Sequence, residues 1–194
     1  MKIGIYGGSF DPPHIGHVLM LHCLLLTQDL DKILILPTAD HPIKGDLTPL
    51  GHRIQMCYDA FGAIGYSRVS IDPLENQLEK PNYTKKTLVA LRERYPEQDL
   101  YYIIGSDLVE DIPDWEYSEG ITDLATFMVV PRQGYPISSD APNILGNYVE
   151  VDLGFPLPEI SSTHIKKMVQ RGVGVDGYIP RGVIQYLTKN GLYT

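Results

Sequence analysis

The sequence has few cysteines, no long apolar run and no excess of positive charge. Only two of its 194 residues are cysteine, and Cys23 and Cys57 have neither the spacing of metal ligands nor a catalytic setting. We expect both to be buried free thiols. The longest nearly apolar run, HVLMLHCLLL at 17–26, is too short and too rich in histidine to cross a bilayer. We therefore expect no membrane span.

The charge balance is acidic. Lysine and arginine number 16 against 24 aspartates and glutamates, so the formal net charge is -8. A charge of this sign repels nucleic acid and anionic membranes, and we predict neither as a partner. A polyanionic ligand would need local help from backbone N–H groups, a few placed cations and a divalent metal. Since the N-terminus lacks a signal-peptide pattern, we predict a cytoplasmic protein. The sequence leaves a homo-oligomer open.

Strand-like and helix-like segments alternate along the chain. Helix-like periods occupy 16–28, 50–61 and 84–95, and a weaker one runs from 106–112 towards 118–124. Continuous apolar strands alternating with helices are typical of a parallel sheet covered on both faces. We predict an α/β fold with an open, doubly wound parallel sheet, as a single domain over 1–194. The strand-like runs lie at 2–6, 32–37, 68–72, 100–105, 126–131 and 148–152.

Two polar, proline-containing stretches, 37–49 and 132–147, read as loops and not as domain boundaries. The end of the chain reads as two short helices, at 161–172 and 180–191. The first is begun by serine and threonine and the second by proline, and a glycine closes each.

The segment GGSFDPPHIGH, at 7–17, follows the first strand-like run directly. In an open α/β sheet the first strand-to-helix turn faces the ligand, and Gly7 and Gly8 permit a positive φ and close backbone approach there. A helix that begins near Gly16 points its dipole at the site, and the spacing of His14 and His17 lets both rings face one pocket. An isolated histidine pair is more often polar surface, but beside the two glycines we favour a phosphate site.

Three later positions admit both a structural and a functional interpretation. Hydroxyls at 161–163 cap a helix, whose N-terminus is also an anion site. Gly105 and Asp107 either end a strand and cap a helix, or approach a nucleotide and bind ribose hydroxyls. Trp115, the only tryptophan, is either core or a stacking surface.

The opening segment resembles the G-x-F-x-P-x-H-x-G-H signature of the nucleotidyltransferase superfamily, and HIGH at 14–17 spells its short motif. The chain resembles bacterial-type nicotinate-mononucleotide adenylyltransferases most, with further matches at PNYTKKTL, YIIGSDLVEDIPDW, VPRQGYP and ISSTHIKKMVQRG. The resemblance implies a Rossmann-like nucleotidyltransferase fold, in which helices from about 161 complete an ATP site. It also implies transfer of an adenylyl group from ATP to nicotinate mononucleotide, which yields deamido-NAD and pyrophosphate.

The resemblance also assigns roles to individual residues. Catalysis falls to His14, His17, Lys44 and Lys166, with Mg²⁺ as cofactor held mainly by the ATP phosphates and no metal site of the protein's own. Flat stacking of Trp115 on the pyridine ring and recognition of the nicotinate carboxylate by Thr84 and Thr87 are implied. The implied mononucleotide-binding residues are His14, Lys44, Tyr83, Thr84, Thr87, Trp115 and Arg132. The implied ATP-binding residues are Gly7, Gly8, Ser9, Phe10, His17, Gly105, Asp107, Ile160, Ser161, Ser162 and Thr163.

The sequence contains no arrangement typical of covalent catalysis. It shows no Ser-His-Asp or Cys-His pattern and no paired catalytic carboxylates. Adenylyl transfer can instead proceed by direct in-line attack of the mononucleotide 5'-phosphate on the α-phosphorus of ATP. Positioning and charge stabilisation then supply the catalysis.

Two positions depart from the pattern of the resembled family. Lys166 stands where the family usually has arginine, and lysine cannot form a bidentate fork to phosphate. We therefore expect weaker binding of the triphosphate unless His164 or Lys167 helps. Ile43 stands where the family usually has histidine, with His41 as a candidate substitute. These departures put the preference for nicotinate over nicotinamide mononucleotide in question.

Other functions on related folds remain alternatives. Pantetheine-phosphate adenylyltransferase usually has threonine where His14 stands, and glycerol-phosphate-type cytidylyltransferases differ at ISSTHIK. Class I aminoacyl-tRNA synthetases share HIGH, but no K-M-S-K-S occurs here. A nucleotide-sensing module would bind ATP or a dinucleotide without releasing pyrophosphate.

Overall fold

A computed structural model of the chain describes residues 1–40, 45–64, 66–155 and 157–194. Six strands form one sheet in the order β3-β2-β1-β4-β5-β6, and every pairing is parallel. The predicted doubly wound α/β fold is confirmed. The strands are β1 (Lys2–Gly8), β2 (Lys32–Pro37), β3 (Val69–Ile71), β4 (Asp99–Gly105), β5 (Thr126–Val130) and β6 (Tyr148–Glu150).

The strands bury both faces, as their continuous apolar runs require. Successive side chains of a strand point to opposite faces of a sheet. In β2, Ile33 and Ile35 accordingly join one buried cluster, whereas Leu34 and Leu36 join the other. Since β1 and β4 sit at the centre of the sheet, their carboxyl ends meet where the chain crosses from one half of the sheet to the other, which is where open α/β sheets bind ligands.

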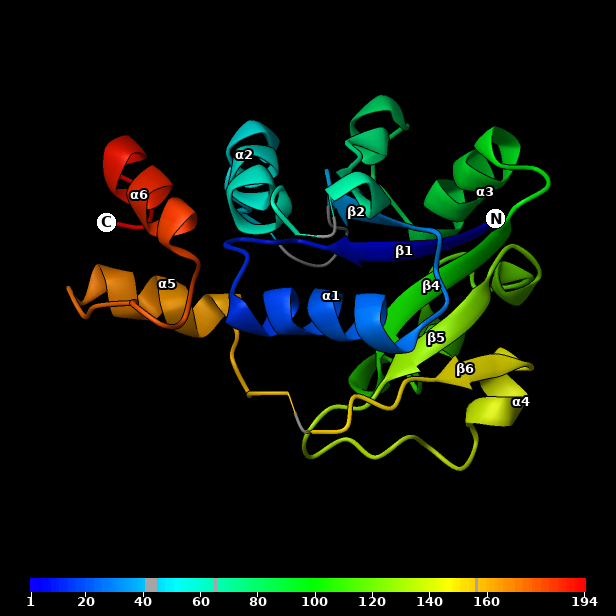
Figure 1. Cartoon of the computed structure of the whole chain (residues 1–194). Coiled ribbons are helices and arrows are strands. Elements are labelled where there is room, and N and C mark those ends of the chain that lie inside the picture. The colour runs from blue at the N-terminus through cyan, green and yellow to red at the C-terminus, as the bar shows by residue number, and fades with distance from the viewer. Residues whose placement is uncertain (41–44, 65, 156) are drawn as a thin grey trace.

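Helices cover the two faces unequally. The first cluster includes residues of α1 (Ile15–Thr27), α2 (Leu50–Phe61), α5 (Ser162–Gln170) and α6 (Arg181–Asn190). The second includes residues of α3 (Thr84–Arg94), of α4 (Ala141–Leu145) and of several 3₁₀ turns. Cys23 and Cys57 are free and buried, as predicted. In Figure 1, α5 and α6 lie on the side towards which the carboxyl end of β1 points.

Two predictions between β4 and β6 are wrong. The weaker helix expected over 106–124 is three 3₁₀ turns, η3 (Ser106–Leu108), η4 (Ile112–Asp114) and η5 (Ile121–Asp123). Pro113 lacks an amide donor and Gly120 adopts a left-handed φ of 69°, so a continuous helix cannot form. The loop expected over 132–147 contains the short helix α4, which begins with Ala141 and Pro142 and ends before Gly146.

The turns and helix ends elsewhere follow the sequence closely. Two 3₁₀ turns flank β3, η1 (Tyr66–Arg68) and η2 (Leu74–Gln77). Ser161 caps α5 by accepting a hydrogen bond from the backbone N–H of His164, and Gly191 ends α6 at a φ of 58°. In the part of the chain that the structure describes, no helix is long and apolar enough to cross a membrane.

Candidate active site

The segment after β1 forms a tight, buried corner at the carboxyl edge of the sheet. Gly7 and Gly8 are the last residues of β1, not part of the turn, and neither has a positive φ. The left-handed conformation expected of the glycines belongs to Phe10, with a φ of 45°. The Phe10 side chain is buried and packs edge-on against the rings of His17 and Phe61. A Cβ on Gly8 would lie 3.0 Å from that ring, so any larger residue there would push the Phe10 ring out of place.

The two histidines of the segment stack on each other, a contact that goes beyond the prediction that both rings face one pocket. Their ring centroids lie 3.6 Å apart at 22° between planes. His14 is the N-cap residue of α1, and its backbone N–H donates to Nδ1 of His17 at 3.1 Å. A neutral His17 that accepts at Nδ1 carries its proton on Nε2. His17 is thereby oriented to donate from Nε2.

His14 is buried and neutral. Only 4% of its surface is exposed, and its Nδ1 has no hydrogen-bond partner among the described residues. Burial, with a smaller contribution from the charge of Arg132, lowers the pKa of His14 to about 4. At neutral pH this imidazole therefore acts through hydrogen bonds and not as a cation.

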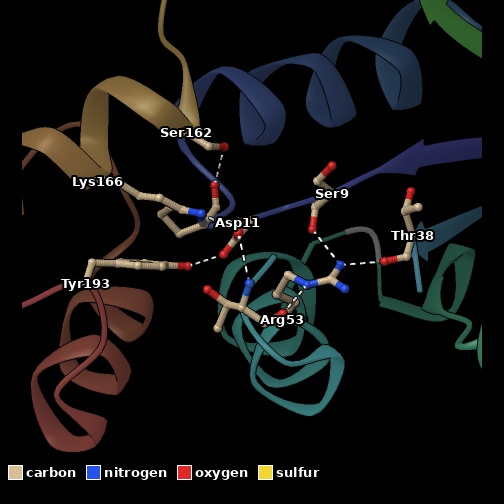
Figure 2. A network of polar contacts seen from close by, with 9 residues as sticks. Ser9, Asp11, Thr38, Arg53, Ser162, Lys166 and Tyr193 are labelled. Carbon is tan, nitrogen blue, oxygen red and sulfur yellow. Dashed lines mark hydrogen bonds and ion pairs between the residues drawn. The ribbon is translucent and has the colours of Figure 1, made fainter. Parts of the chain in front are cut away.

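Asp11 joins the segment to the C-terminal helices (Figure 2). Its buried carboxylate accepts from the Lys166 ammonium and the Thr48 N–H at one oxygen and from the Tyr193 hydroxyl at the other. Burial raises the pKa of Asp11, but these hydrogen bonds together outweigh it and leave the pKa below its usual value. Asp11 is therefore a carboxylate that holds Lys166, a predicted catalytic residue, next to the segment.

Arg53 of α2 fastens the loops around this corner. Its guanidinium is buried and donates to the carbonyl oxygens of Thr48, Ser9 and Thr38 at 2.6–2.9 Å. A fourth, longer hydrogen bond of 3.4 Å reaches Ala39. The loops that follow β1 and β2 are thus tied to one side chain, as Figure 2 shows for Ser9 and Thr38.

The N-terminus of α5 reaches the same segment. The hydroxyl of Ser162 donates to the carbonyl oxygen of Pro12 at 2.9 Å, 150 residues away in sequence. Ser161 is occupied as the helix cap, Thr163 is exposed, and Ile160 is partly buried against the first cluster. The predicted anion site at this helix N-terminus is thus brought to the histidine pair, and its phosphate-binding role stays a prediction.

Beside β1, the end of β4 carries the second predicted nucleotide contact. A Cβ on Gly105 would collide with Asp107 and lie 2.8 Å from Cδ of Arg132, so no larger residue fits without a shift. Asp107 forms an ion pair with Arg132 at 3.3 Å, and Ser106 Oγ accepts from the Arg132 N–H. A cavity of about 590 Å³ opens next to Arg132, at the carboxyl ends of β5 and β6, lined by residues 131–133 and 150–155.

Three of the predicted mononucleotide-binding residues lie at the start of α3, namely Tyr83, Thr84 and Thr87. The buried Thr87 hydroxyl donates to Glu75 at 2.9 Å, so its proton is already engaged, whereas Thr84 lies beside the hydroxyl of the partly buried Tyr102. The Tyr83 ring is exposed in part and meets Tyr117 edge-on at 5.3 Å.

Trp115 is half-buried against the second cluster, so part of its ring packs on the core and part stays exposed. Lys44 lies outside the described residues, as do His41 and Ile43. The binding roles predicted for all these residues stay predictions.

Four buried polar atoms have no hydrogen-bond partner among the described residues, and all of them lie in or directly beside this region. Buried polar groups are nearly always paired, so such a concentration marks a place that a polar ligand can complete. The four atoms are Tyr6 Oη, Ser9 Oγ, His14 Nδ1 and Asp107 Oδ1. Three belong to residues that the sequence singled out, but Tyr6 was missed because it reads as part of an apolar strand.

Sequence reasoning also missed Arg53, Tyr193 and Glu75. Their side chains are separated in sequence from the predicted residues that they contact by 12 to 182 positions, and the contacts exist only in the folded chain. One signal was present: a charged residue inside the helical pattern of 50–61, at a position where the period demands burial.

The chain is similar to known proteins over nearly its whole length. Residues 5–168 match the family model described as cytidylyltransferase-like. A probable nicotinate-nucleotide adenylyltransferase of Myxococcus xanthus is 35% identical over 193 residues, which cover 100% of this chain and 95% of the relative. The nicotinate-nucleotide adenylyltransferase of Bacillus subtilis is 34% identical over 194 residues, covering 99% and 98%.

A solved structure is similar over the whole chain. The nicotinic acid mononucleotide adenylyltransferase of Plasmodium falciparum, complexed with NaAD, superposes with a TM-score of 0.84 at 25% identity. The match covers 99% of this chain and 97% of that one. By family model, by full-length relatives and by structure, the chain belongs to the nicotinate-nucleotide adenylyltransferases of the cytidylyltransferase-like family.

Proposed function

We propose that the protein joins MgATP and nicotinate mononucleotide to form deamido-NAD and pyrophosphate. The observation that carries this proposal is the stacked pair of His14 and His17 at the carboxyl edge of β1, beside the N-terminus of α5 and Lys166. Asp11 and Pro12 of the histidine-bearing segment thus contact Lys166 and Ser162 of α5, which brings neutral and charged donors to one edge of the sheet. A B. subtilis relative that covers the full chain bears the name of this activity.

The reaction is a direct displacement. An oxygen of the mononucleotide 5'-phosphate forms a bond to the α-phosphorus of ATP, and the bond from that phosphorus to the bridging oxygen of the β-phosphate breaks. Pyrophosphate leaves with the electron pair, and the adenylyl group passes to the mononucleotide without a covalent enzyme intermediate. The protein contributes orientation and stabilisation of the charge on the reacting phosphates.

The residues divide that work. His17, with Nδ1 occupied by the His14 N–H, donates from Nε2 to the α-phosphate. His14 contributes a neutral hydrogen bond, and Lys166 adds positive charge at the triphosphate. The amide groups that begin α5 complete the phosphate site.

Mg²⁺ enters as part of the substrate, bound to the phosphate oxygens of ATP. Among the described residues, no group of three or more His, Cys, Asp and Glu side chains is placed to hold a metal ion alone. Both oxygens of the buried Asp11 are taken by Lys166, Thr48 and Tyr193. When bound, the ion supplies charge neutralisation on the triphosphate.

Pyrophosphate release tests the proposal. The protein is incubated with MgATP and, in parallel, with nicotinate mononucleotide, nicotinamide mononucleotide, phosphopantetheine or no second substrate. We expect the highest kcat/KM with nicotinate mononucleotide. Preference for nicotinamide mononucleotide would overturn the assigned substrate, and MgATP binding without pyrophosphate release from any pair would point to a nucleotide sensor.

His17→Ala provides the matched test of the site. Loss of one preorganised donor to a reacting phosphate typically lowers the rate by about 100- to 1,000-fold. His22→Ala is the control, because His22 lies on the same helix with its side chain exposed. Near-normal turnover by a folded His17→Ala protein would refute the role of His17.

A further inference from the structure

The penultimate residue of the chain reaches into the nucleotide site. The Tyr193 hydroxyl donates to Oδ1 of Asp11 at 2.5 Å across 182 residues of sequence (Figure 2). The tail turns back to make this contact, because the Leu192 N–H bonds the carbonyl oxygen of Leu187 and Tyr193 adopts a φ of 65°. An aromatic residue rarely occupies this left-handed region, so the surrounding contacts must outweigh its cost.

Tyr193 acts on Lys166 directly through its ring and indirectly through Asp11. The ammonium lies 5.1 Å from the centre of the tyrosine ring, within cation–π range. It also donates to Oδ2 of Asp11, whose other oxygen the tyrosine hydroxyl holds. The Lys166 ammonium thus lies between the Tyr193 ring and the Asp11 carboxylate, which the Tyr193 hydroxyl orients.

The arrangement leaves Lys166 available to a ligand. An ammonium group has three N–H donors, and the hydrogen bond to Asp11 uses one. The Lys166 side chain is 26% exposed, whereas that of Asp11 is 2% exposed. Burial, together with the hydrogen bond to Asp11, raises the pKa of Tyr193, so the phenol stays a donor at neutral pH.

We propose that Tyr193 is a positioning residue for the ATP triphosphate: its ring and its hydroxyl, acting through Asp11, hold the Lys166 ammonium beside the phosphate site. A lone lysine on a flexible stem is a weaker phosphate ligand than arginine unless its stem is restrained. The tail supplies that restraint. This inference rests on the MgATP site of the proposed function and deepens it.

Two substitutions separate the hydroxyl from the ring. Tyr193→Phe keeps the ring beside Lys166 and removes the hydrogen bond to Asp11, whereas Tyr193→Leu removes both. Titration calorimetry with MgATP alone measures affinity without turnover. We expect roughly 3- to 10-fold weaker binding for Tyr193→Phe, from the loss of one hydrogen bond. We expect a further loss of about 2- to 5-fold for Tyr193→Leu, from the loss of the cation–π contact.

In steady-state kinetics, we expect the KM values of the two substrates to respond differently to these substitutions. The KM for MgATP rises with the dissociation constant, whereas the KM for nicotinate mononucleotide stays within about two-fold. Tyr58→Leu is the matched control, because Tyr58 is an exposed tyrosine on α2 and should change neither value. Thermal unfolding establishes that each variant is folded, and Tyr193→Phe carries the test if Tyr193→Leu does not fold.

A double-mutant cycle tests the route through Lys166. In a Lys166→Met background, Tyr193→Phe should change MgATP affinity by less than about two-fold, because the group that it positions is gone. An undiminished effect in that background would overturn the inference. So would unchanged MgATP affinity in Tyr193→Leu, or equal rises in KM for both substrates. A wild-type protein that binds MgATP but releases no pyrophosphate would refute the proposed reaction and leave the calorimetric comparison valid.

Discussion

Replacement of Arg53 by methionine should lower the free energy of unfolding, because Arg53 ties together the loops that form the site. Methionine has a similar reach and no charge, so Arg53→Met removes every hydrogen bond of the guanidinium while filling much of its volume. The side chain is 1% exposed, so water cannot replace the lost donors without opening the structure. The carbonyl oxygens of Ser9, Thr38 and Thr48 would each lose their bond to it.

The magnitude follows from those bonds. Hydrogen bonds to a charged group contribute about 1.5–3 kcal/mol each, so the three bonds of 2.6–2.9 Å total roughly 5–9 kcal/mol before costs. Burial lowers the pKa of Arg53, which shows that desolvation of the guanidinium offsets part of this sum. We expect a net loss of about 3–5 kcal/mol, the range seen when one partner of a buried charged network is removed.

Equilibrium unfolding in urea is the assay. A loss of that size is a large fraction of the roughly 5–15 kcal/mol that stabilises a typical protein. In a chain of this length it should lower the Tm by roughly 6–20 °C. Arg68→Met serves as the control, because Arg68 is exposed and its two hydrogen bonds to carbonyls are 3.1 and 3.4 Å long. A loss below about 1 kcal/mol for Arg53→Met would refute the assignment of Arg53 as the tie between these loops.

Two further predictions concern the buried polar atoms of the site. The pKa of His14 is lowered from 6.5 to about 4, so the unfolded chain binds this proton more tightly. The free energy of unfolding should therefore fall by up to about 1.4 kcal/mol per unit as pH drops from 6.5 towards 4, and His14→Asn should remove that slope. If the free energy of unfolding had the same pH dependence in the wild-type protein and in His14→Asn, this prediction would be wrong. Tyr6→Phe removes a buried hydroxyl without a partner among the described residues, so stability measured in urea should hold or rise by up to about 1–3 kcal/mol. A loss above 1 kcal/mol would show that the hydroxyl is paired.

The fold could be predicted from the sequence because the spacing of apolar residues along a segment indicates which of its faces are buried. The run KILILP is apolar at every position after Lys32, which is typical of a strand covered on both faces, and β2 has the predicted bounds. The wrong prediction of a helix over 106–124 has a physical origin. Around η4, Pro113 and the left-handed Gly120 interrupt helical hydrogen bonding, while the apolar residues Ile112 and Ile121 still reach the second cluster from separate turns.

The histidine pair could be predicted because it depends on local geometry alone. His14 is the extended N-cap residue of α1 and His17 is the third residue of that helix, and the cap geometry brings two such side chains together. Gly7 and Gly8 show the limit of the same reasoning. Their closeness to β1 was evident, but the residue that takes the positive φ is Phe10, whose ring is held in place by His17 and Phe61.

The role of Asp11, in the same motif, could not be inferred from the residues near it in sequence. Asp11 sits between Phe10 and Pro12, and nothing near it in sequence binds it. Its partners come from residues 48, 166 and 193, which meet only after the sheet has formed and the C-terminal helices have packed beside it. A single buried carboxylate therefore links completion of the fold to the position of Lys166. Disturbing the tail should thus change phosphate binding before it changes the sheet, since Ser162 of α5 and Tyr193 after α6 contact the motif while the six strands pair without them.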